Sequence, residues 1–139
     1  MKTLFFTGKG GVGKSTLSAA TAWQLSQKGY RVLAVSFDPA HNLGDIFGRT
    51  LSHKKKRFTD TLYLQEANLE QAASDYVRQN TDILTEVYSY TRAFNLDLYF
   101  KVLKHAPAVE GYAALTVMDQ LLRRETEFDY LFFVPPPSG

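Results

Sequence analysis

Short apolar runs alternate with longer amphipathic stretches along the chain. The apolar runs have the composition of strands buried in a parallel sheet, and they cover residues 4–7, 31–36, 62–64 and 128–134. The amphipathic stretches repeat apolar residues at helical spacing, and they cover residues 14–28, 69–90, 94–105 and 110–124. Strands that alternate with helices in this way predict an α/β fold with a mostly parallel sheet.

The first strand, the helix after it and the second strand form one βαβ unit. Several apolar side chains of that helix share one face, which we predict to be buried: Leu17, Ala20, Ala22, Trp23 and Leu25. Gly29 is a typical helix-ending residue. We predict a loop over residues 37–48 and an exposed polar segment over residues 53–57.

The residues from Gly8 to Ser15, GKGGVGKS, match the phosphate-binding pattern G-x-x-x-x-G-K-[ST] at every fixed position. Backbone N–H groups of such a loop hold phosphate oxygens, together with the N-terminus of the following helix. We therefore predict that Lys14 contacts the phosphates of ATP and that Ser15, with Thr16 beside it, binds Mg²⁺. The remaining loop residues would contact the nucleotide through the backbone: Gly8, Gly10, Gly11, Val12 and Gly13. The alternative is a glycine-rich turn without a ligand, but the flanking strand and helix favour the nucleotide.

Composition narrows the choice of function. A chain of 139 residues has the length of one domain, and its net charge of +2 does not favour a nucleic acid partner. The sequence has no cysteine, which excludes disulfides, thiolate-held clusters and cysteine zinc sites from these residues. No apolar run has the length of a membrane span. The first residues superficially resemble a signal peptide, but their apolar run is too short and glycines follow at once, so we expect a cytoplasmic location. The basic run 54–57 is interpreted as a solvated loop, with a peripheral membrane contact left open.

A second lysine, Lys9, lies inside the glycine loop. With it, residues 9–15 resemble the deviant Walker A pattern found in one group of P-loop ATPases. This resemblance implies a homodimer whose two nucleotide sites face each other. Lys9 would then reach into the partner's site and act as a catalytic cation on the transferring phosphoryl group. In the other interpretation, Lys9 is only a polar loop residue.

The segment after the second strand makes the resemblance more specific. Residues 37–48, FDPAHNLGDIFG, resemble the D-P-A-H-N-L-x-D-x-F-G segment of the arsenite-pump and tail-anchored-protein targeting ATPase family. The resemblance implies that Asp38 is catalytic, because it positions the attacking water, and that it helps Ser15 to hold Mg²⁺. It also implies that Asn42 and Asp45 belong to a switch loop that responds to the γ-phosphate.

The residue types alone leave simpler interpretations of this segment open. Asp38 followed by Pro39 also fits an ordinary turn, and Asp45 also fits a helix cap. The position directly after a strand favours the functional interpretation for Asp38, because ligands gather at the carboxyl ends of parallel strands. His41 is interpreted as a packing or hydrogen-bonding residue, because no cluster of metal ligands accompanies it.

The last predicted strand departs from the family pattern. In the family that strand ends in an aspartate and a threonine before a P-T-G turn, whereas Val134 and Pro135 stand at those positions here. Valine cannot hold a magnesium-bound water, and Asp129 would lie at the other end of the strand. Two functions therefore stay open. One is an ATPase whose nucleotide state switches a dimer and drives a partner or cargo; the other is a nucleotide-binding scaffold with little hydrolysis.

The resemblance also implies a domain organisation. The fold would be a three-layer P-loop NTPase with helices on both faces of the sheet, and residues 1–139 would be its N-terminal part, truncated at the C-terminal side. Residues 68–125 would be a helical insertion between the two switch regions. In the targeting branch this region forms a methionine-rich client groove, but only Met118 occurs in it here. The protein partner or cargo therefore stays unidentified.

Overall fold

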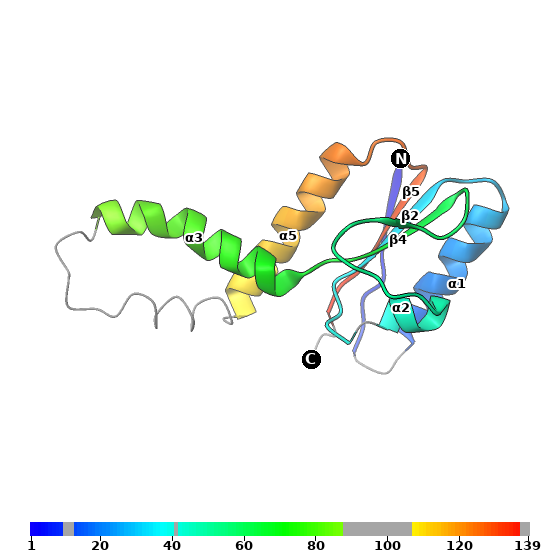
Figure 1. Cartoon of the computed structure of the whole chain (residues 1–139), viewed down its shortest axis with the longest axis horizontal. Helices are drawn as coiled ribbons and strands as arrows, with labels where there is room; N and C mark the ends of the chain where they lie inside the picture. Colours follow the sequence, from blue (N-terminus) through cyan, green and yellow to red (C-terminus); the bar gives the residue numbers. More distant parts are fainter. Residues whose placement is uncertain (10–12, 41, 88–106, 137–139) are drawn as a thin grey trace. The chain divides into compact units, whose positions relative to one another are not determined.

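The computed structural model describes residues 1–9, 13–40, 42–87 and 107–136 (Figure 1). The chain forms two compact units. One unit joins Met1–Asn68 with Gln120–Gly139, and the other is Leu69–Asp119. The first unit carries the sheet, and the described part of the second unit is helical.

Among the described residues, the sheet has five strands in the order β1-β5-β2-β4-β3. The strands are β1 (Lys2–Phe5), β2 (Val32–Ser36), β3 (Lys56–Arg57), β4 (Leu62–Glu66) and β5 (Tyr130–Val134). All neighbouring pairs are parallel except the edge pair of β3 and β4. The predicted α/β fold with a mostly parallel sheet is confirmed, and the short strand β3 is an element that the sequence pattern did not predict.

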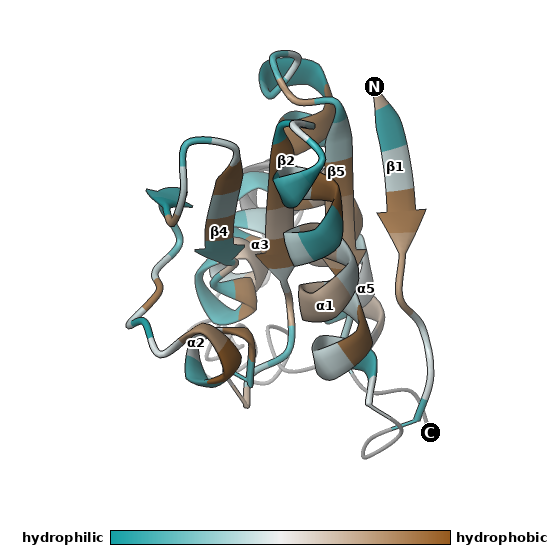
Figure 2. Ribbon diagram, turned by 90° about the vertical axis from the view of Figure 1, so that its right-hand side faces the viewer, coloured by the Kyte–Doolittle hydropathy of each residue, from teal (hydrophilic) through white to brown (hydrophobic). Residues whose placement is uncertain are grey.

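The central strands β2 and β5 are apolar because they are buried. β2 and β5 are in register from Val32 opposite Tyr130 to Ser36 opposite Val134. Every residue of β2 is buried, as expected for a strand that is covered on both faces. Figure 2 shows the hydrophobic colouring that runs through β2 and β5.

Two helices pack on one face of the sheet, α1 (Lys14–Gln27) and α2 (Asn42–Phe47). The core under them takes its buried side chains from both helices and from alternate strand positions: Ala19, Ala22, Val32, Ala34, Leu43, Leu62, Leu64 and Phe132. Because side chains alternate along a strand, Ser36, Glu66 and Val134 lie on this same face. These three residues form a row at the carboxyl ends of β2, β4 and β5, the edge of the sheet at which α1 begins.

The predicted apolar face of α1 is only partly buried. Ala22 is fully buried and Leu25 packs against the core, but Leu17 and Trp23 are 61% and 42% exposed. The other buried positions are small or polar residues outside that face, among them Ser18, Ala19 and Ser26. Small side chains let the helix backbone lie close to the sheet. The buried hydroxyls cost little, because Ser18 Oγ and Ser26 Oγ each donate to a carbonyl of the helix itself, at 2.9 Å. Gly29 ends the helix as predicted, with a φ of 92°.

The first strand also differs from its prediction. It was expected to be buried, but among the described residues β1 pairs only with β5 and forms an edge of the sheet. Phe5 is accordingly 56% exposed. An apolar run indicates a strand, but it does not say which strand occupies the edge.

The segment 37–48 contains α2, although it was predicted to be a loop. A helix of six residues has little stability by itself, so its contacts with the rest of the protein must hold it in place. Its Leu43 is fully buried in the core.

Two longer helices agree with the predictions. They are α3 (Leu69–Val87) and α5 (Pro107–Arg124). In the second unit the rings of Tyr76 and Tyr112 stack with centroids 5.9 Å apart, which joins α3 to α5. The helix predicted over residues 94–105 lies outside the described residues.

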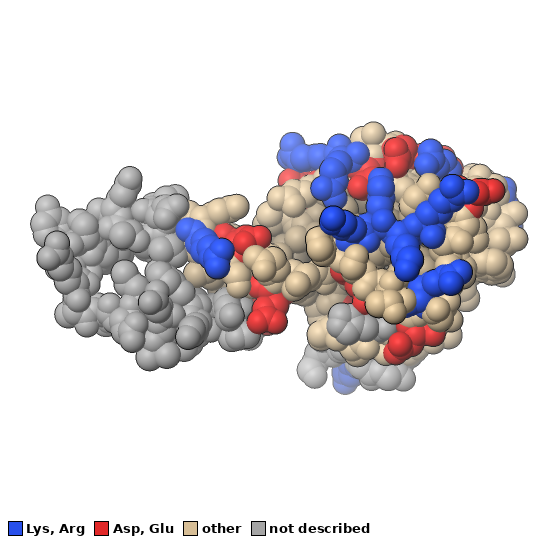
Figure 3. Space-filling view, viewed as in Figure 1, with Lys and Arg blue, Asp and Glu red and all other residues tan. Residues whose placement is uncertain are grey.

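Residues 53–57 are exposed, as predicted. Lys and Arg side chains gather on one face of the sheet-bearing unit (Figure 3). Two of these basic side chains contact residues nearby in the sequence. Lys56 Nζ donates to the Thr50 carbonyl at 3.3 Å, and Arg57 forms an ion pair with Asp60. The basic run is therefore exposed as predicted, but it is not all loop, because Lys56 and Arg57 form the edge strand β3. No helix among the described residues is long and apolar enough to cross a membrane.

Candidate nucleotide-binding site

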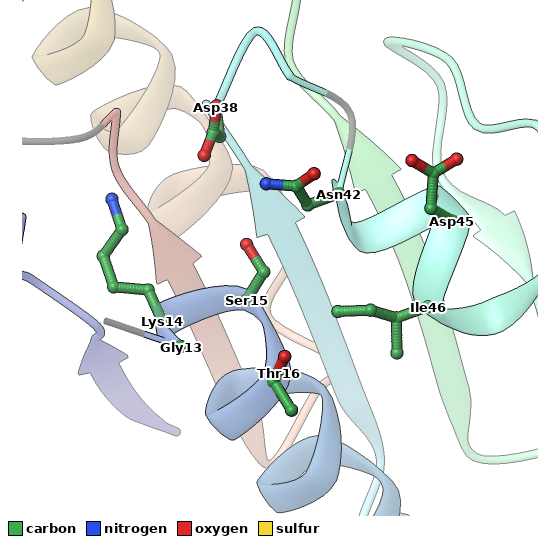
Figure 4. A pocket seen from close by; sticks show the side chains of 8 residues that line it. All are labelled: Gly13, Lys14, Ser15, Thr16, Asp38, Asn42, Asp45 and Ile46. Carbon is green, nitrogen blue, oxygen red and sulfur yellow. The ribbon is translucent and has the colours of Figure 1, made fainter. Parts of the chain in front are cut away.

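A pocket of about 360 Å³ lies where α1 and α2 begin, next to the end of β2. Its lining comes from these three places, and it consists of Gly13, Lys14, Ser15, Thr16, Asp38, Asn42, Asp45 and Ile46. Figure 4 shows Lys14 and Ser15 pointing up from α1, Asp38 pointing down from above, and Asn42 pointing from α2 into the space between them. The fold therefore brings the predicted phosphate, magnesium and switch residues to one pocket.

The start of α1 depends on Gly13. Its φ of 85° is left-handed, which strains any residue with a Cβ. Its carbonyl accepts the N–H of Leu17 at 2.9 Å, so the helix begins directly after the turn. The loop residues Gly10, Gly11 and Val12 lie outside the described residues.

Lys14 is a cation held in a mostly buried position. Its residue is 7% exposed, and its Nζ donates to the carbonyl of Pro135 at 2.9 Å. An ammonium group has three N–H donors, so this bond fixes the direction of the side chain and leaves donors for an anion. The contact also ties α1 to the chain segment that follows β5.

Ser15 and Asp38 are buried polar residues, 8% and 7% exposed. The backbone N–H of Asp38 donates to Ser36 Oγ at 3.2 Å, and Asp38 Oδ1 accepts the N–H of Ala40 at 2.9 Å. This second bond is an Asx turn, so the turn interpretation of Asp38 is also correct. A carboxylate has about four acceptor positions, so the turn and a functional role are compatible.

The side chains around Ser15 fit magnesium. A hydroxyl, a carboxylate and an amide oxygen are hard ligands of the type that Mg²⁺ prefers, and Mg²⁺ beside phosphates takes few ligands from protein. Among the described residues, no group of three or more His, Cys, Asp and Glu side chains is placed to hold a metal without such phosphates. His41 lies outside the described residues.

Of the predicted site residues that the structure describes, Gly8 and Lys9 lie outside the pocket lining. Gly8 is half-buried, and Lys9 is exposed. Lys14, in contrast, is part of the lining. Asn42 and Asp45 are exposed residues on α2, and both line the pocket.

Glu66 is a polar residue near the site for which no role was predicted. This carboxylate ends β4, is 7% exposed, and its Oε1 accepts the N–H of Gly44 in α2 at 3.1 Å. A signal existed in the sequence, because an acidic residue two positions after the apolar run 62–64 is expected at the same sheet edge as Asp38.

The position at which the resemblance implies an aspartate is apolar here. Val134 is fully buried, lies opposite Ser36, and accepts the N–H of Phe37 through its carbonyl at 2.8 Å. Asp129 lies at the other end of β5, as predicted, where its Oδ2 accepts the N–H of Arg31 at 2.8 Å.

Comparison with known proteins identifies the family of this chain. The family model for anion-transporting ATPases matches residues 1–139. The chain belongs to the anion-transporting ATPase family. The arsenical pump-driving ATPase of Escherichia coli is 34% identical over 140 residues, which are 98% of this chain and 24% of that protein. A protein of Aquifex aeolicus that provisionally carries the same name is 31% identical over 140 residues, which are 100% of this chain and 46% of its own length.

The resemblance to this family of P-loop NTPases is therefore confirmed. A further relative, from Acidiphilium multivorum, is named an arsenical pump-driving ATPase and is 33% identical over 98% of this chain. The chain spans less than half the length of each of these anion-transporting ATPase relatives. Their names say that they are ATPases that drive a pump.

Proposed function

We propose that this protein binds ATP with Mg²⁺ in the pocket between α1 and α2 and hydrolyses it. One observation carries the proposal: Lys14, Ser15 and Asp38, from two separate segments, line one pocket at the carboxyl end of a parallel sheet. Membership of a family of ATPases supports the same reaction.

Each residue has a role that its position supports. Lys14 stabilises the β- and γ-phosphate oxygens through its N–H donors, which offsets the charge that develops during phosphoryl transfer. The Ser15 hydroxyl holds the metal, and Asp38 orients the attacking water or a water on the metal. Bound Mg²⁺ would supply a Lewis acid for the phosphate oxygens. Asn42 and Asp45 extend from α2 to sense whether the γ-phosphate is present.

We further propose that the protein works as a homodimer that passes its nucleotide state to a partner or cargo. The deviant Walker A resemblance and the exposed Lys9 support a contact across two facing sites. The relatives' names mention driving a pump, which fits an ATPase that performs its work through a second protein. The identity of that partner is left open.

A second candidate function is a nucleotide-dependent scaffold with little turnover. The buried Val134 favours it, because the position next to the pocket lacks the carboxylate of the resembling family. Turnover under saturating ATP and Mg²⁺ separates the two functions.

A titration of purified protein with Mg·ATP tests the site. Lys14→Ala is expected to weaken ATP binding about 10- to 100-fold, because it removes hydrogen bonds from a charged donor. Asp38→Ala is expected to lower turnover by about 100-fold and to change ATP affinity little. Lys28→Ala is the matched control, since it removes the same charge from an exposed position at the other end of α1. Equal affinities of wild type, Lys14→Ala and Lys28→Ala would refute the assignment.

A further inference from the structure

We propose that Glu66 is a positioning residue for the nucleotide site. It holds α2 in the place from which Asn42 reaches the pocket. The expected effect of Glu66 on ATP turnover rests on the proposed ATPase function. The effect of Glu66 on the stability of α2 can be measured without nucleotide.

Glu66 contacts α2 directly from the sheet. Its carboxylate lies on the same face of β4 as Leu62 and Leu64, the face on which α1 and α2 pack. There its Oε1 accepts the N–H of Gly44 at 3.1 Å, and both residues are buried. A buried hydrogen bond with a charged acceptor is stronger than one between neutral groups.

Gly44 is confined on two sides. A Cβ at this position would lie 2.7 Å from the carbonyl oxygen of Arg49 and 3.1 Å from Glu66 Oε1, so only glycine fits. The carbonyl of Gly44 in turn accepts the N–H of Arg49 at 2.9 Å. The centre of α2 is therefore held through both its N–H and its C=O.

The backbone around Glu66 connects this contact to the strand that leads to Asp38. The N–H of Ala67 donates to the carbonyl of Ser36 at 2.8 Å, and the N–H of Glu66 donates to the carbonyl of Ser52 at 2.9 Å. Ser36 also accepts the N–H of Asp38 through its hydroxyl. Glu66 and its neighbour Ala67 thus join the end of β2, the segment after α2 and α2 itself.

The site needs such a hold because α2 is short and its pocket residues are exposed. Asn42 and Asp45 gain no fixed position from burial of their own side chains. Lys14 and Ser15 belong to α1, which begins at the Gly13 turn, so we expect their positions to change less than those of Asn42 and Asp45 when the Glu66 contact is lost. Loss of the Glu66 contact should therefore impair the chemical step more than the binding of ATP.

The test compares three variants with wild type. Glu66→Ala removes the acceptor and is expected to lower kcat roughly tenfold or more while KM for ATP stays within about threefold. Glu66→Gln keeps an oxygen that can accept the Gly44 N–H and is expected to restore kcat to within about threefold of wild type. Gln65→Ala is the matched control: Gln65 is 5% exposed on the other face of β4, and its Nε2 donates to the His53 carbonyl at 2.8 Å.

Amide hydrogen exchange without nucleotide measures the hold itself. Exchange of α2 amides is expected to be about tenfold faster in Glu66→Ala than in wild type or Gln65→Ala, with α1 unchanged. If α2 exchanges at the wild-type rate in Glu66→Ala, the inference is overturned, whatever the enzyme does. It is also overturned if Gln65→Ala lowers kcat as much as Glu66→Ala. If wild type neither binds nor hydrolyses ATP, the proposed function fails, and the exchange result still decides the role of Glu66.

Discussion

At the scale of single residues, Val134 stands where the resemblance to the family implies an aspartate. Its neighbours place it next to the candidate site. Ser36, opposite it on β2, accepts the N–H of Asp38, and the next carbonyl along the chain, that of Pro135, accepts from Lys14. A carboxylate at position 134 would therefore lie at the edge of the pocket, but a valine there is fully buried.

The substitution Val134→Asp tests what that position can do. Without ligand it is expected to lower the free energy of unfolding by at least about 2 kcal/mol, because a polar group replaces an apolar one at a buried site. Mg·ATP should restore more stability to this variant than to wild type, because the metal would partner the new carboxylate. Melting temperatures with and without Mg·ATP, together with kcat, measure both effects.

Val134→Asn is the control for this experiment. Asparagine has nearly the same shape as aspartate and is also polar, but it brings no charge to the metal. Ligand-induced gains in melting temperature that are equal in Val134→Asp and Val134→Asn would contradict a metal-facing position. A rise in kcat for Val134→Asp would support the view that valine slows the natural enzyme.

At the scale of elements, the apolar runs predicted strands β2, β4 and β5 well, because a strand covered on both faces has few polar positions. The glycine pattern predicted the start of α1, because few sequences satisfy its fixed spacing. The buried face of α1 could not be predicted from hydrophobicity, since Ser18 and Ser26 are buried and satisfy their hydroxyls within the helix.

The helix α2 escaped prediction for a different reason. Its six residues form a helix where Glu66, 22 positions away along the chain, accepts the N–H of Gly44. Local sequence cannot reveal such a contact. Similarly, Ser36, Glu66 and Val134 form a row only because three strands end at one edge of the sheet. Local motifs predicted Ser15 and Asp38, but no local motif indicates that Glu66 contacts α2.

The ion pairs of Lys55 join the segment before β3 to the segment between α5 and β5. They lead to a prediction about how stability depends on pH. Lys55, next to β3, donates to Glu125 Oε2 at 2.7 Å and to Glu127 Oε1 at 3.1 Å, and both acceptors lie between α5 and β5. The hydrogen bond to Glu125 raises the pKa of Lys55 above its ordinary value of 10.5, against a smaller opposite effect of burial. A raised pKa in the folded state means that the contact stabilises the fold fully below about pH 10.5 and is lost as pH rises further.

Lys55→Met is expected to lower the free energy of unfolding by about 1 kcal/mol at pH 8. A larger effect is not expected, because about a third of the lysine side chain is exposed and water screens the ion pair. The difference from wild type should stay constant between about pH 7 and 10 and shrink above about pH 10.5. Thermal unfolding across this pH range measures it. Lys54→Met, at an exposed neighbour, should show little change at any pH. A difference for Lys55→Met that grows above pH 10.5 would contradict the assigned contact.

At the scale of the whole molecule, the question is whether two copies complete each other's sites. Lys9 is exposed and is absent from the lining of its own pocket, whereas Lys14, five residues later, is buried in that lining. Lys9 is therefore accessible to solvent or to a second copy of the chain, whereas Lys14 is enclosed by its own chain. An exposed cation next to a phosphate site can act on a second site if that site approaches it across a two-fold axis.

Mixing two inactive variants tests this arrangement. In a dimer of one Lys9→Ala and one Asp38→Ala subunit, action across the interface leaves one site with both groups intact and the other with neither. Equal mixing makes half of all dimers mixed, so about one quarter of wild-type hydrolysis should return. If Lys9 serves its own subunit, each site of the mixed dimer lacks one group and no activity returns. Mixing Lys9→Ala with the double variant Lys9→Ala/Asp38→Ala is the control, because no site then has a partner lysine. Absence of recovery in dimers whose mixed composition is verified by two affinity tags would rule out action across the interface.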